Sequence, residues 1–399
     1  MCGICGELRF DNTSPNRDRI ERMKAKLEQR GPDSEGSYFN DAIGLGHRRL
    51  AIIDLSDKAA QPMVDEAKGI ALVFNGTIYN YPELRKELQG LGHEFKSSGD
   101  TEVILKAYIE WGADCLQRLH GMFAFAIWDA NKKELLLTRD RVGIKPLYFS
   151  QTDERLLFAS NTQALIHADN GIDKDIDAAA LHNLFSLHAV VPAPRTILKG
   201  IRKVKPAHYM VFKQDGSVEE TRYWTLTAKR PDKKMSEQDW VEAIRASLKK
   251  SVERRVKIAD VPVGVLLSGG IDSSLLVGLL AEAGAKDLKT FSVGFEDQPE
   301  EKGNEFEYSD AVAEHFNTEH HRFLVPNSHV LPKLPEAFAH MAEPMFGQDA
   351  VAFYLLAEQV SKEIKVVQSG QGADEVFGGY FWYPRMMADT QGSPTERFA

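Results

Sequence analysis

Residues 265–274 read Val-Leu-Leu-Ser-Gly-Gly-Ile-Asp-Ser-Ser, which is a strand-like apolar run, a glycine turn and the polar start of a helix. Further strand-like runs follow at 288–293, 321–325 and 365–367, with helical segments between them. Strands that alternate with helices indicate a doubly wound parallel sheet, and such a sheet binds ligands beyond the carboxyl ends of its strands. We therefore predict an α/β domain with its binding loop in the glycine turn.

The glycine turn has the chemistry of a phosphate-binding loop. Gly269 and Gly270 let a ligand approach the backbone closely, and successive N–H groups at a helix N-terminus attract an anion. Asp272 can hold Mg²⁺ against the phosphates. The turn lacks the lysine of a Walker motif, which argues against an NTPase that cleaves a γ-phosphate.

A second glycine-rich cluster, residues 368–380, follows the last predicted strand of this domain. Its Asp374 is the natural second acid for Mg²⁺ or pyrophosphate, and Ser369 and Gly370 are expected near a nucleotide. The backbone of Val293, at the end of the neighbouring strand, is expected to meet an adenine ring. The alternative, a solvated turn without a ligand, has less support because the cluster directly follows a strand of the sheet.

Short apolar strands and a few helices make up the first part of the chain, to about residue 225. The strands are bounded by Gly, Asn and Asp, which suggests stacked antiparallel sheets flanked by helices, an α+β arrangement. The predicted strands are 73–74, 122–128, 134–139 and 156–159, and the predicted helices are 82–91 and 102–111.

Residues 225–239 are polar and charged and lack apolar periodicity, which predicts a linker. Ser236 and Asp239 have the spacing of a helix-capping box. Apolar residues then recur on one helical face, at Trp240, Ile244, Leu248 and Val252. The sequence thus predicts two domains, residues 2–225 and 236–399.

The charge balance, 49 basic against 58 acidic residues or −9 overall, leaves no footprint for binding nucleic acid or an anionic membrane. No apolar stretch approaches the ~20 residues of a membrane span, and the N-terminal residues lack the layout of a signal peptide. Three cysteines are too few for a disulfide framework. We expect a cytoplasmic protein with reduced thiols that acts on small molecules.

Cys2 follows the initiator methionine, so removal of Met1 would leave a free α-amine on the residue that carries the thiol. The amine has a reference pKa of about 7.7 to 8.0 and the thiol one of about 8.5, so the two form a base and nucleophile pair. Alternatively, Cys2 and Cys5 form a redox or half-zinc C-x-x-C motif. That motif would lack both a surrounding thioredoxin-like βαβ unit and a second cysteine pair.

Other residues of the first domain offer the further groups that amide hydrolysis needs. Arg49 can hold a substrate carboxylate with its forked guanidinium, and Asp100 can accept from an ammonium group. The Asn75 side chain and the Gly76 N–H can donate to the oxyanion of a tetrahedral intermediate.

Residues 2–210 resemble the class II glutamine amidotransferases, whose glutaminase domains begin Cys-Gly-Ile. The resemblance implies an N-terminal nucleophile sandwich in which Cys2 attacks the side-chain amide of glutamine and releases ammonia, with Asn75 and Gly76 also catalytic. Thr77 stands where the family usually has a glutamate, so it cannot offer that charge to the glutamine ammonium. The glutamine-binding residues that the resemblance implies are Arg49, Leu50, Ala51, Ile52, Ile53, Asn75, Gly76, Thr77 and Asp100.

The Ser-Gly-Gly-Ile-Asp-Ser turn resembles that of the ATP pyrophosphatases, and the order of motifs over the whole chain resembles the glutamine-hydrolysing asparagine synthetases. The resemblance implies ATP and Mg²⁺, and an acceptor carboxylate that is adenylated and then aminated, releasing AMP and pyrophosphate. Asp272 and Asp374 would hold the metal ion. The implied ATP-binding residues are Leu267, Ser268, Gly269, Gly270, Asp272, Ser273, Val293, Ser369 and Gly370.

The family default for the acceptor is aspartate. Gln371 stands where asparagine-forming members usually have a glutamate, and an amide cannot act as a general base. Asn161 replaces another glutamate of the usual pattern, and both changes also resemble the N-acetylglutaminylglutamine amidotransferases, which amidate a dipeptide. A non-catalytic binding or regulatory homologue is a weaker alternative because Cys2, Asp272 and Asp374 are all present.

Members of the family continue well beyond the second glycine-rich cluster, whereas this chain ends nineteen residues after Tyr380. We therefore expect a whole glutaminase domain followed by a C-terminally truncated synthetase domain, with the glutaminase chemistry the more secure. A homodimer is compatible with the sequence.

Overall fold

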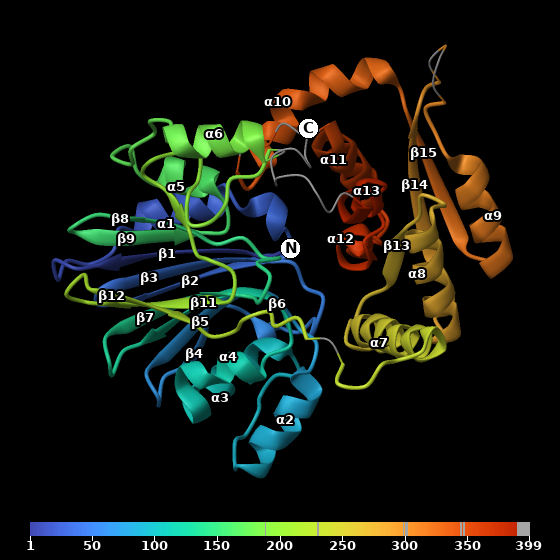
Figure 1. Cartoon of the computed structure of the whole chain (residues 1–399). Helices are drawn as coiled ribbons and strands as arrows, with labels where there is room; N and C mark the ends of the chain where they lie inside the picture. The colour runs from blue at the N-terminus through green and yellow to red at the C-terminus, as the bar shows by residue number, and fades with distance from the viewer. Residues whose placement is uncertain are drawn as a thin grey trace. The chain divides into compact units, whose positions relative to one another are not determined.

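The computed structural model describes residues 1–388 apart from 188, 230, 298, 300, 301, 344, 346 and 347. The chain forms two compact units (Figure 1). The first unit comprises Met1–Lys234 and Pro332–Val351, and the second comprises Met235–Leu331 and Ala352–Ala399.

Two six-stranded antiparallel sheets form the centre of the first unit, in the orders β10-β8-β9-β1-β3-β2 and β12-β11-β7-β6-β5-β4. The strands of the first sheet are β1 (Gly3–Arg9), β2 (Ser34–Asn40), β3 (Ile43–Arg49), β8 (Tyr148–Gln151), β9 (Arg155–Ala159) and β10 (Arg202–Lys203). Those of the second are β4 (Met63–Asp65), β5 (Ile70–Ile78), β6 (Gly121–Asp129), β7 (Glu134–Arg139), β11 (His208–Lys213) and β12 (Val218–Arg222).

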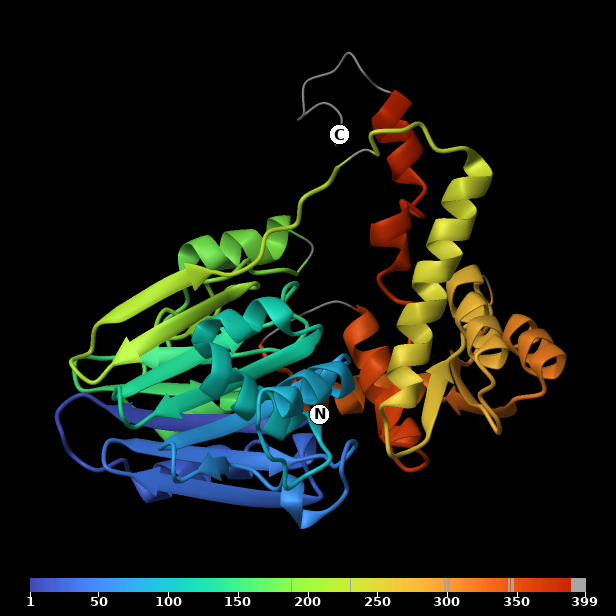
Figure 2. The ribbon, with the colours of Figure 1, turned by 90° about the horizontal axis from the view of Figure 1, so that it is seen from below.

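Helices cover the outer face of each sheet in the first unit (Figure 1; Figure 2). They are α1 (Arg17–Ala25), α5 (Thr162–Ala168) and α6 (Ala178–Ser186) on one side, and α2 (Tyr81–Gly90), α3 (Asp100–Trp111) and α4 (Cys115–Arg118) on the other. The α+β sandwich predicted from the sequence is therefore confirmed. The short strand predicted at 73–74 is part of the nine-residue strand β5, because β6 pairs with β5 along its whole length.

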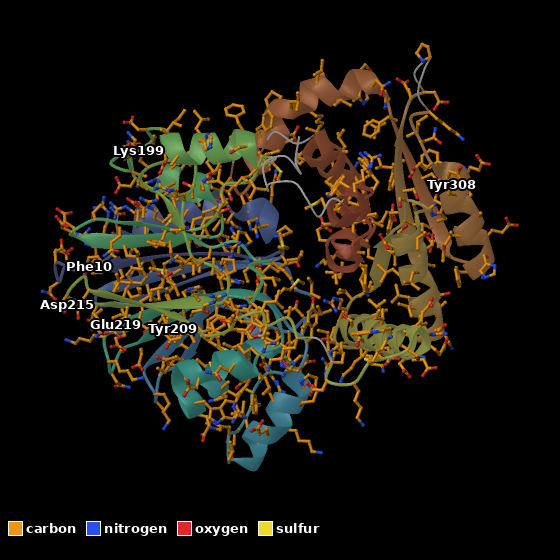
Figure 3. All side chains as sticks on the ribbon, in the orientation of Figure 1. Phe10, Lys199, Tyr209, Asp215, Glu219 and Tyr308 are labelled. Atoms are coloured by element: carbon orange, nitrogen blue, oxygen red, sulfur yellow. The ribbon has the colours of Figure 1, made fainter. Side chains whose placement is uncertain are left out.

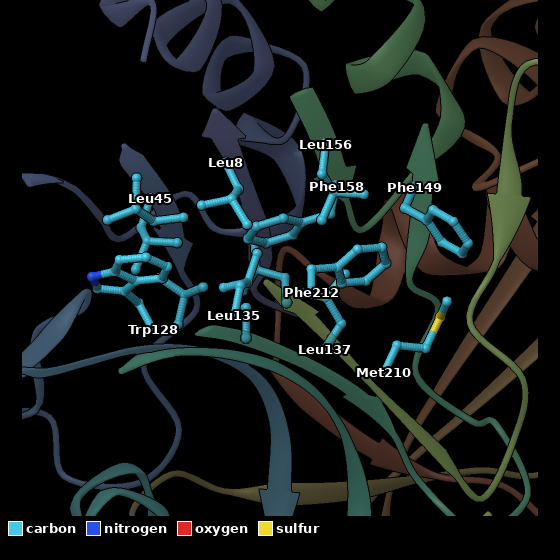
Figure 4. Close-up of a cluster of buried hydrophobic side chains, with 14 of the residues drawn as sticks. Leu8, Leu45, Trp128, Leu135, Leu137, Phe149, Leu156, Phe158, Met210 and Phe212 are labelled. Carbon is cyan, nitrogen blue, oxygen red and sulfur yellow. The ribbon is translucent and has the colours of Figure 1, made fainter. Parts of the chain in front are cut away.

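The core of the sandwich lies between the two sheets (Figure 4). Large apolar side chains from the inner face of each sheet meet there, for example Leu8, Phe158 and Phe212, which are fully buried. Each sheet also has one further apolar cluster between its outer face and its helices. For this reason β1 and β6 are buried on both faces. Charged side chains such as Lys199, Asp215 and Glu219 cover the outside (Figure 3).

Residues 332–351 lie in the first unit although their neighbours in sequence belong to the second. The Thr162 N–H donates to the Ala342 carbonyl at 2.9 Å. The Glu343 carboxylate accepts from Lys203 Nζ at 2.6 Å and from the Tyr148 hydroxyl at 3.3 Å. A buried lysine thus finds its counter-ion in this returning segment.

A four-stranded parallel sheet of order β15-β14-β13-β16 forms the second unit, as the alternation of strands and helices predicts. Apolar clusters fill both faces of the sheet. The strands are β13 (Val263–Leu266), β14 (Lys289–Phe295), β15 (Glu319–Val325) and β16 (Val366–Gln368). The helices of this part of the chain are α7 (Glu237–Lys257), α8 (Ile271–Glu282), α9 (Phe306–Phe316), α10 (Val330–His340), α11 (Gln348–Val360), α12 (Ala373–Phe377) and α13 (Trp382–Ala388).

Helix α7 begins where the sequence predicts. Ser236 is its N-cap, and Ser236 and Asp239 each accept from the other's backbone N–H in a capping box. The predicted apolar face is only partly covered, since Val252 is buried whereas Trp240 and Ile244 are exposed. No helix in the described part of the chain is long and apolar enough to cross a membrane.

Candidate functional site

Cys2 immediately precedes β1 and lies beside the end of β3. The antiparallel pairing of these strands places Gly3 opposite Arg48, so Cys2 and Arg49, one position beyond that pair, lie next to each other. The Leu50 N–H donates to the Cys2 thiol sulfur at 3.3 Å, and the thiol lies 3.7 Å from the Leu50 carbonyl. Burial raises the pKa of this thiol, while the Leu50 hydrogen bond, the amino terminus and Arg49 act to lower it.

Cys5 lies in a different environment from Cys2. Its thiol is buried between β1 and the α1 side of the sheet and donates to the Gly46 carbonyl at 3.7 Å. Burial raises the pKa of the Cys5 thiol to about 12, so this thiol is not reactive at neutral pH. Each thiol has its own partner and all three cysteines are free, which does not support a redox pair.

Arg49, at the end of β3, organises the loop that follows it. The buried guanidinium donates to the backbone carbonyls of Asp54 and Ser56, at 3.0 Å in the second case. The Ala51 N–H donates to the Asp33 carboxylate at 2.7 Å, which holds the start of the same loop. The predicted glutamine-binding stretch 50–53 is therefore a supported loop that begins at the Cys2 thiol.

Asn75 and Gly76 lie in β5, where they pair with Ala124 and Phe123 of β6. Asn75 is 1 % exposed, and neither its side-chain oxygen nor its side-chain nitrogen has a hydrogen-bond partner in the described part of the chain. A Cβ atom at Gly76 would lie 2.2 Å from the Met122 carbonyl oxygen, so only glycine fits there. A buried amide without partners is costly, and a ligand that supplies the partners removes that cost.

Asp100 begins α3 and is buried. Its carboxylate accepts from the Ile78 N–H at 3.0 Å, which ties the helix start to the end of β5. Burial raises the pKa of Asp100 to about 6, although backbone hydrogen bonds and Arg49 oppose the shift. Asp100 and Arg49 are also among the charges that act on the Cys2 thiol, so the structure brings these three predicted residues together. Thr77, between Gly76 and Ile78, is buried as well.

Sequence reasoning missed two buried side chains that hold β5 just before Asn75. The neighbouring strand β4 pairs with β5 only from Met63 onward, and Pro62 has no N–H to extend the ladder. Gln61 accepts from the Phe74 N–H at 2.7 Å, and the His47 ring nitrogen Nε2 lies 3.1 Å from the Phe74 carbonyl oxygen. Gln61 and His47 lie 13 and 27 positions from Phe74 along the chain, so no local sequence pattern predicts either contact.

His47 is neutral at ordinary pH. Burial lowers its pKa to about 3, and Arg49 adds to the shift. In the neutral ring the Nε2 atom that faces a carbonyl must carry the proton, so His47 donates to the Phe74 carbonyl. Together Gln61 and His47 satisfy both backbone groups of Phe74.

In the second unit, the predicted phosphate loop joins β13 to α8. Gly269 has φ +91°, a conformation that glycine adopts readily, and Gly270 is the N-cap of the helix. The Ser273 hydroxyl lies 3.1 Å from both the Ser268 hydroxyl and the Gly270 carbonyl. Leu267 is buried, whereas Ser268 and Gly270 are exposed at the end of the strand, so these two residues of the loop are open to solvent.

The second glycine-rich cluster lies next to that loop. β16 runs parallel to β13 and carries Gln368 opposite Val265. A Cβ atom at Gly370 would lie 2.9 Å from Asp272 Cβ and 3.0 Å from the Ser273 nitrogen, so the two loops touch. Asp374 follows in α12, and Val293 lies on β14, the other neighbour of β13.

Carboxylate oxygens of Asp272 and Asp374 are the hard ligands that Mg²⁺ prefers. The described residues contain no group of three or more His, Cys, Asp or Glu side chains that could hold a metal ion by themselves.

The departures from the family pattern at Asn161 and Gln371 lie in different surroundings. Asn161 is buried as the N-cap of α5, where its side chain accepts from the Ala164 N–H at 2.8 Å, so its role is structural. Gln371 is exposed in the turn after β16, and its N–H donates to the Ser369 hydroxyl at 3.2 Å.

Comparisons with known proteins cover both units. The family described as glutamine amidotransferase domain matches residues 1–224, and the family described as asparagine synthase matches residues 243–395. Asparagine synthetase [glutamine-hydrolyzing] 1 of Bacillus subtilis (strain 168) is 36 % identical over 96 % of this chain and 59 % of its own length. A putative asparagine synthetase [glutamine-hydrolyzing] 2 of Methanocaldococcus jannaschii is 36 % identical over 95 % of this chain and 76 % of its own.

Among solved structures, a glutamine phosphoribosylpyrophosphate amidotransferase from B. subtilis matches with a TM-score of 0.45 and 15 % identity, over 81 % of this chain and 91 % of that one. The chain spans about three fifths of the length of the first curated relatives that it matches. Both family matches and the extent of these similarities lead to one assignment: the chain belongs to the glutamine-hydrolysing asparagine synthetase family.

Proposed function

We propose that the first unit hydrolyses glutamine and that Cys2, freed of Met1, is its nucleophile. The observation that carries the proposal is the buried Asn75 amide, which has no hydrogen-bond partner among the described residues. It lies in β5, a strand held by contacts from His47 and Asp100. Such an amide is suited to bind the oxygen of a substrate amide as that oxygen gains charge.

The reaction is an acyl transfer with every proton assigned. The Cys2 sulfur attacks the carboxamide carbon of glutamine, and the thiol proton moves to the α-amine of the same residue. Asn75 and the Gly76 N–H stabilise the oxyanion. When the C–N bond breaks, the amine returns the proton to the leaving nitrogen, which departs as ammonia and leaves a thioester. Water then attacks the thioester carbon and gives a proton to the α-amine. The C–S bond breaks, the amine passes that proton to the Cys2 sulfur, and glutamate leaves.

Glutamine recognition is proposed for Arg49, Asp100 and the loop 50–53. Arg49 offers a positive charge to the α-carboxylate, although its guanidinium also supports the loop through Asp54 and Ser56. Asp100 offers a buried negative charge to the α-ammonium. Since Thr77 supplies no charge, this proposal makes Asp100 the main partner of the ammonium.

We further propose that the second unit adenylates a carboxylate with ATP. Leu267, Ser268, Gly269, Gly270 and Ser273 form the turn that would receive the phosphates, with Ser369, Gly370 and Val293 beside it. Asp272 and Asp374 would hold Mg²⁺, which supplies charge neutralisation for the phosphates when bound. An AMP ester is a far better electrophile than a carboxylate, so ammonia can then displace AMP and form the amide.

The proposed acceptor is aspartate, which would give asparagine, AMP and pyrophosphate. The second candidate acceptor is a dipeptide such as N-acetylglutaminylglutamine, and Gln371 is the observation that favours it. This side chain cannot accept a proton as the usual glutamate would.

Pyrophosphate release from ATP and Mg²⁺ tests these proposals on the full chain, with glutamine as nitrogen donor and either aspartate or the dipeptide as acceptor. Turnover with aspartate alone would reject the dipeptide. Absence of pyrophosphate with both acceptors would reject ligase activity of this chain. Cys2→Ala is expected to abolish glutamine-driven turnover while ammonia still supports it, and equal loss with both nitrogen donors would contradict the assigned role of Cys2.

A further inference from the structure

Lys145 is buried beside the amino terminus. It lies in the loop between β7 and β8 and is only 5 % exposed. Its ammonium nitrogen lies 2.9 Å from the Met1 sulfur, and among the described residues it has no carboxylate within ion-pair distance. A buried ammonium without a counter-ion is costly, and a thioether is a weak acceptor. The protein therefore maintains an unfavourable charge at this position.

The loop that carries Lys145 is held by many hydrogen bonds. The fully buried Asp140 carboxylate accepts four backbone N–H groups, one of them that of Lys145 at 2.9 Å. The Arg139 guanidinium donates to three backbone carbonyls, one of them that of Lys145 at 2.6 Å. This support fixes the backbone of Lys145, so its ammonium is directed at the amino terminus by the fold.

Arg30 adds a second cation at the same place. Its Nε donates to the Cys2 carbonyl at 3.1 Å, and one of its terminal nitrogens is buried without a partner in the described part of the chain. Burial lowers the pKa of the Met1 amine to about 5, with further lowering by Arg30 and Lys145. Burial also lowers the pKa of Lys145 itself to about 8, and Arg30 adds to that shift.

We propose that Lys145 is a positioning residue of the glutaminase site: once Met1 is removed, its ammonium disfavours a proton on the α-amine of Cys2 and favours the thiolate. This inference rests on the proposed glutamine hydrolysis. The new amine is the nitrogen that had joined Met1 to Cys2, and the Lys145 charge already acts on the Met1 amine and interacts with the Cys2 thiol. A neutral amine can accept the thiol proton, whereas an ammonium cannot.

Other charges face this amine and thiol. Arg30 and Arg49 act in the same direction as Lys145, and Asp33 and Asp100 act in the opposite one. The Asp140 carboxylate is occupied by backbone N–H groups. Among the described residues, the Lys145 ammonium has no hydrogen bond to a backbone carbonyl, unlike the guanidinium groups of Arg30 and Arg49.

The test measures the rate at which iodoacetamide alkylates Cys2 as a function of pH, in full chains whose loss of Met1 is verified by mass spectrometry. Cys5 and Cys115 are buried, and a Cys2→Ala chain gives their contribution. Lys145→Met removes the charge at similar length, and we expect the midpoint of the profile to rise by about one pH unit. Lys145→Arg keeps the charge and should restore most of the shift.

Lys106→Met is the matched control. It removes one ammonium from the same unit, but Lys106 pairs with Asp65, and its profile should match the parent chain. Coincident profiles for the parent and Lys145→Met chains would overturn the inference, and Lys145→Gln takes the place of Lys145→Met if that variant does not fold. Because alkylation needs no glutamine, a shifted profile in a chain without glutaminase activity would reject the proposed hydrolysis and leave the electrostatic role of Lys145 supported.

Discussion

At the scale of single residues, Asn75 and Asn80 differ although both are buried amides of the first unit. The Asn80 side chain donates to the Arg118 carbonyl at 2.9 Å and accepts from the His120 N–H at 2.8 Å. Asn75 has no such partners in the described residues. A residue kept for stability has its hydrogen bonds satisfied, so the contrast separates a structural amide from one that is available to a substrate.

This contrast predicts opposite effects of two alanine substitutions. Asn75→Ala should lower kcat for glutamine hydrolysis by about 10²–10³-fold, the usual cost of losing one oxyanion donor, with little loss of stability. Asn80→Ala should remove the hydrogen bonds to the Arg118 carbonyl and from the His120 N–H and cost about 1–3 kcal/mol in the free energy of unfolding. Steady-state glutamate release and urea denaturation measure the two effects. Equal destabilisation by both substitutions would show that Asn75 is a structural residue.

At the scale of elements, strand β5 is supported on one side by β6 and on the other by β4 only in part. Beyond Met63, side chains replace the missing strand, since Gln61 and His47 bind the two backbone groups of Phe74. Gln61 also donates to the Thr101 hydroxyl at 3.3 Å, which connects β5 to the start of α3. The position of Asn75 thus depends on its pairing with β6 and on the contacts of Gln61 and His47 with Phe74.

Gln61→Met should test this support, because methionine has a similar shape and no carbonyl acceptor. The unpaired Phe74 N–H is expected to cost about 1–3 kcal/mol of stability. If Asn75 is displaced and stabilises the transition state by about 1.4 kcal/mol less, kcat should fall about tenfold. Gln151→Met is the control, since the exposed Gln151 side chain donates to the Gly216 carbonyl, away from β5. Similar losses in both variants would contradict the role of Gln61.

Local signals account for the elements that the sequence predicted. The Ser236–Asp239 capping box and the strand, turn and helix around Gly269 depend on residues a few positions apart, so they could be read directly. Strand β12 is exposed along its length and has no apolar signal, and it was not predicted. Gln61 contacts Phe74 across 13 positions and Lys145 contacts Met1 across 144, and no pattern in one sequence reveals such pairs.

At the scale of the whole molecule, each unit has apolar clusters of its own. A chain with more than one core need not unfold in a single step, so a stability measurement must report on one unit at a time. Hydrogen exchange of peptides from β5 and β6 meets this need for the first unit.

His47 is expected to contribute a loss of stability to the first unit as the pH falls below neutral. Its folded pKa, about 3, lies below the unfolded value of 6.5, so only the unfolded chain takes up the proton as pH falls through 6.5. Between pH 7 and pH 5 this uptake should cost about 2 kcal/mol. His47→Gln keeps a donor for the Phe74 carbonyl and removes the titration, so its opening free energy should fall by about 2 kcal/mol less over the same interval. Exchange rates corrected for intrinsic pH dependence give these free energies, and His167→Gln, at an exposed site, should behave like the parent chain. If the parent and His47→Gln chains lost the same stability, His47 would have to be protonated in the folded unit, and it could not then be the neutral donor that holds β5 in front of Asn75.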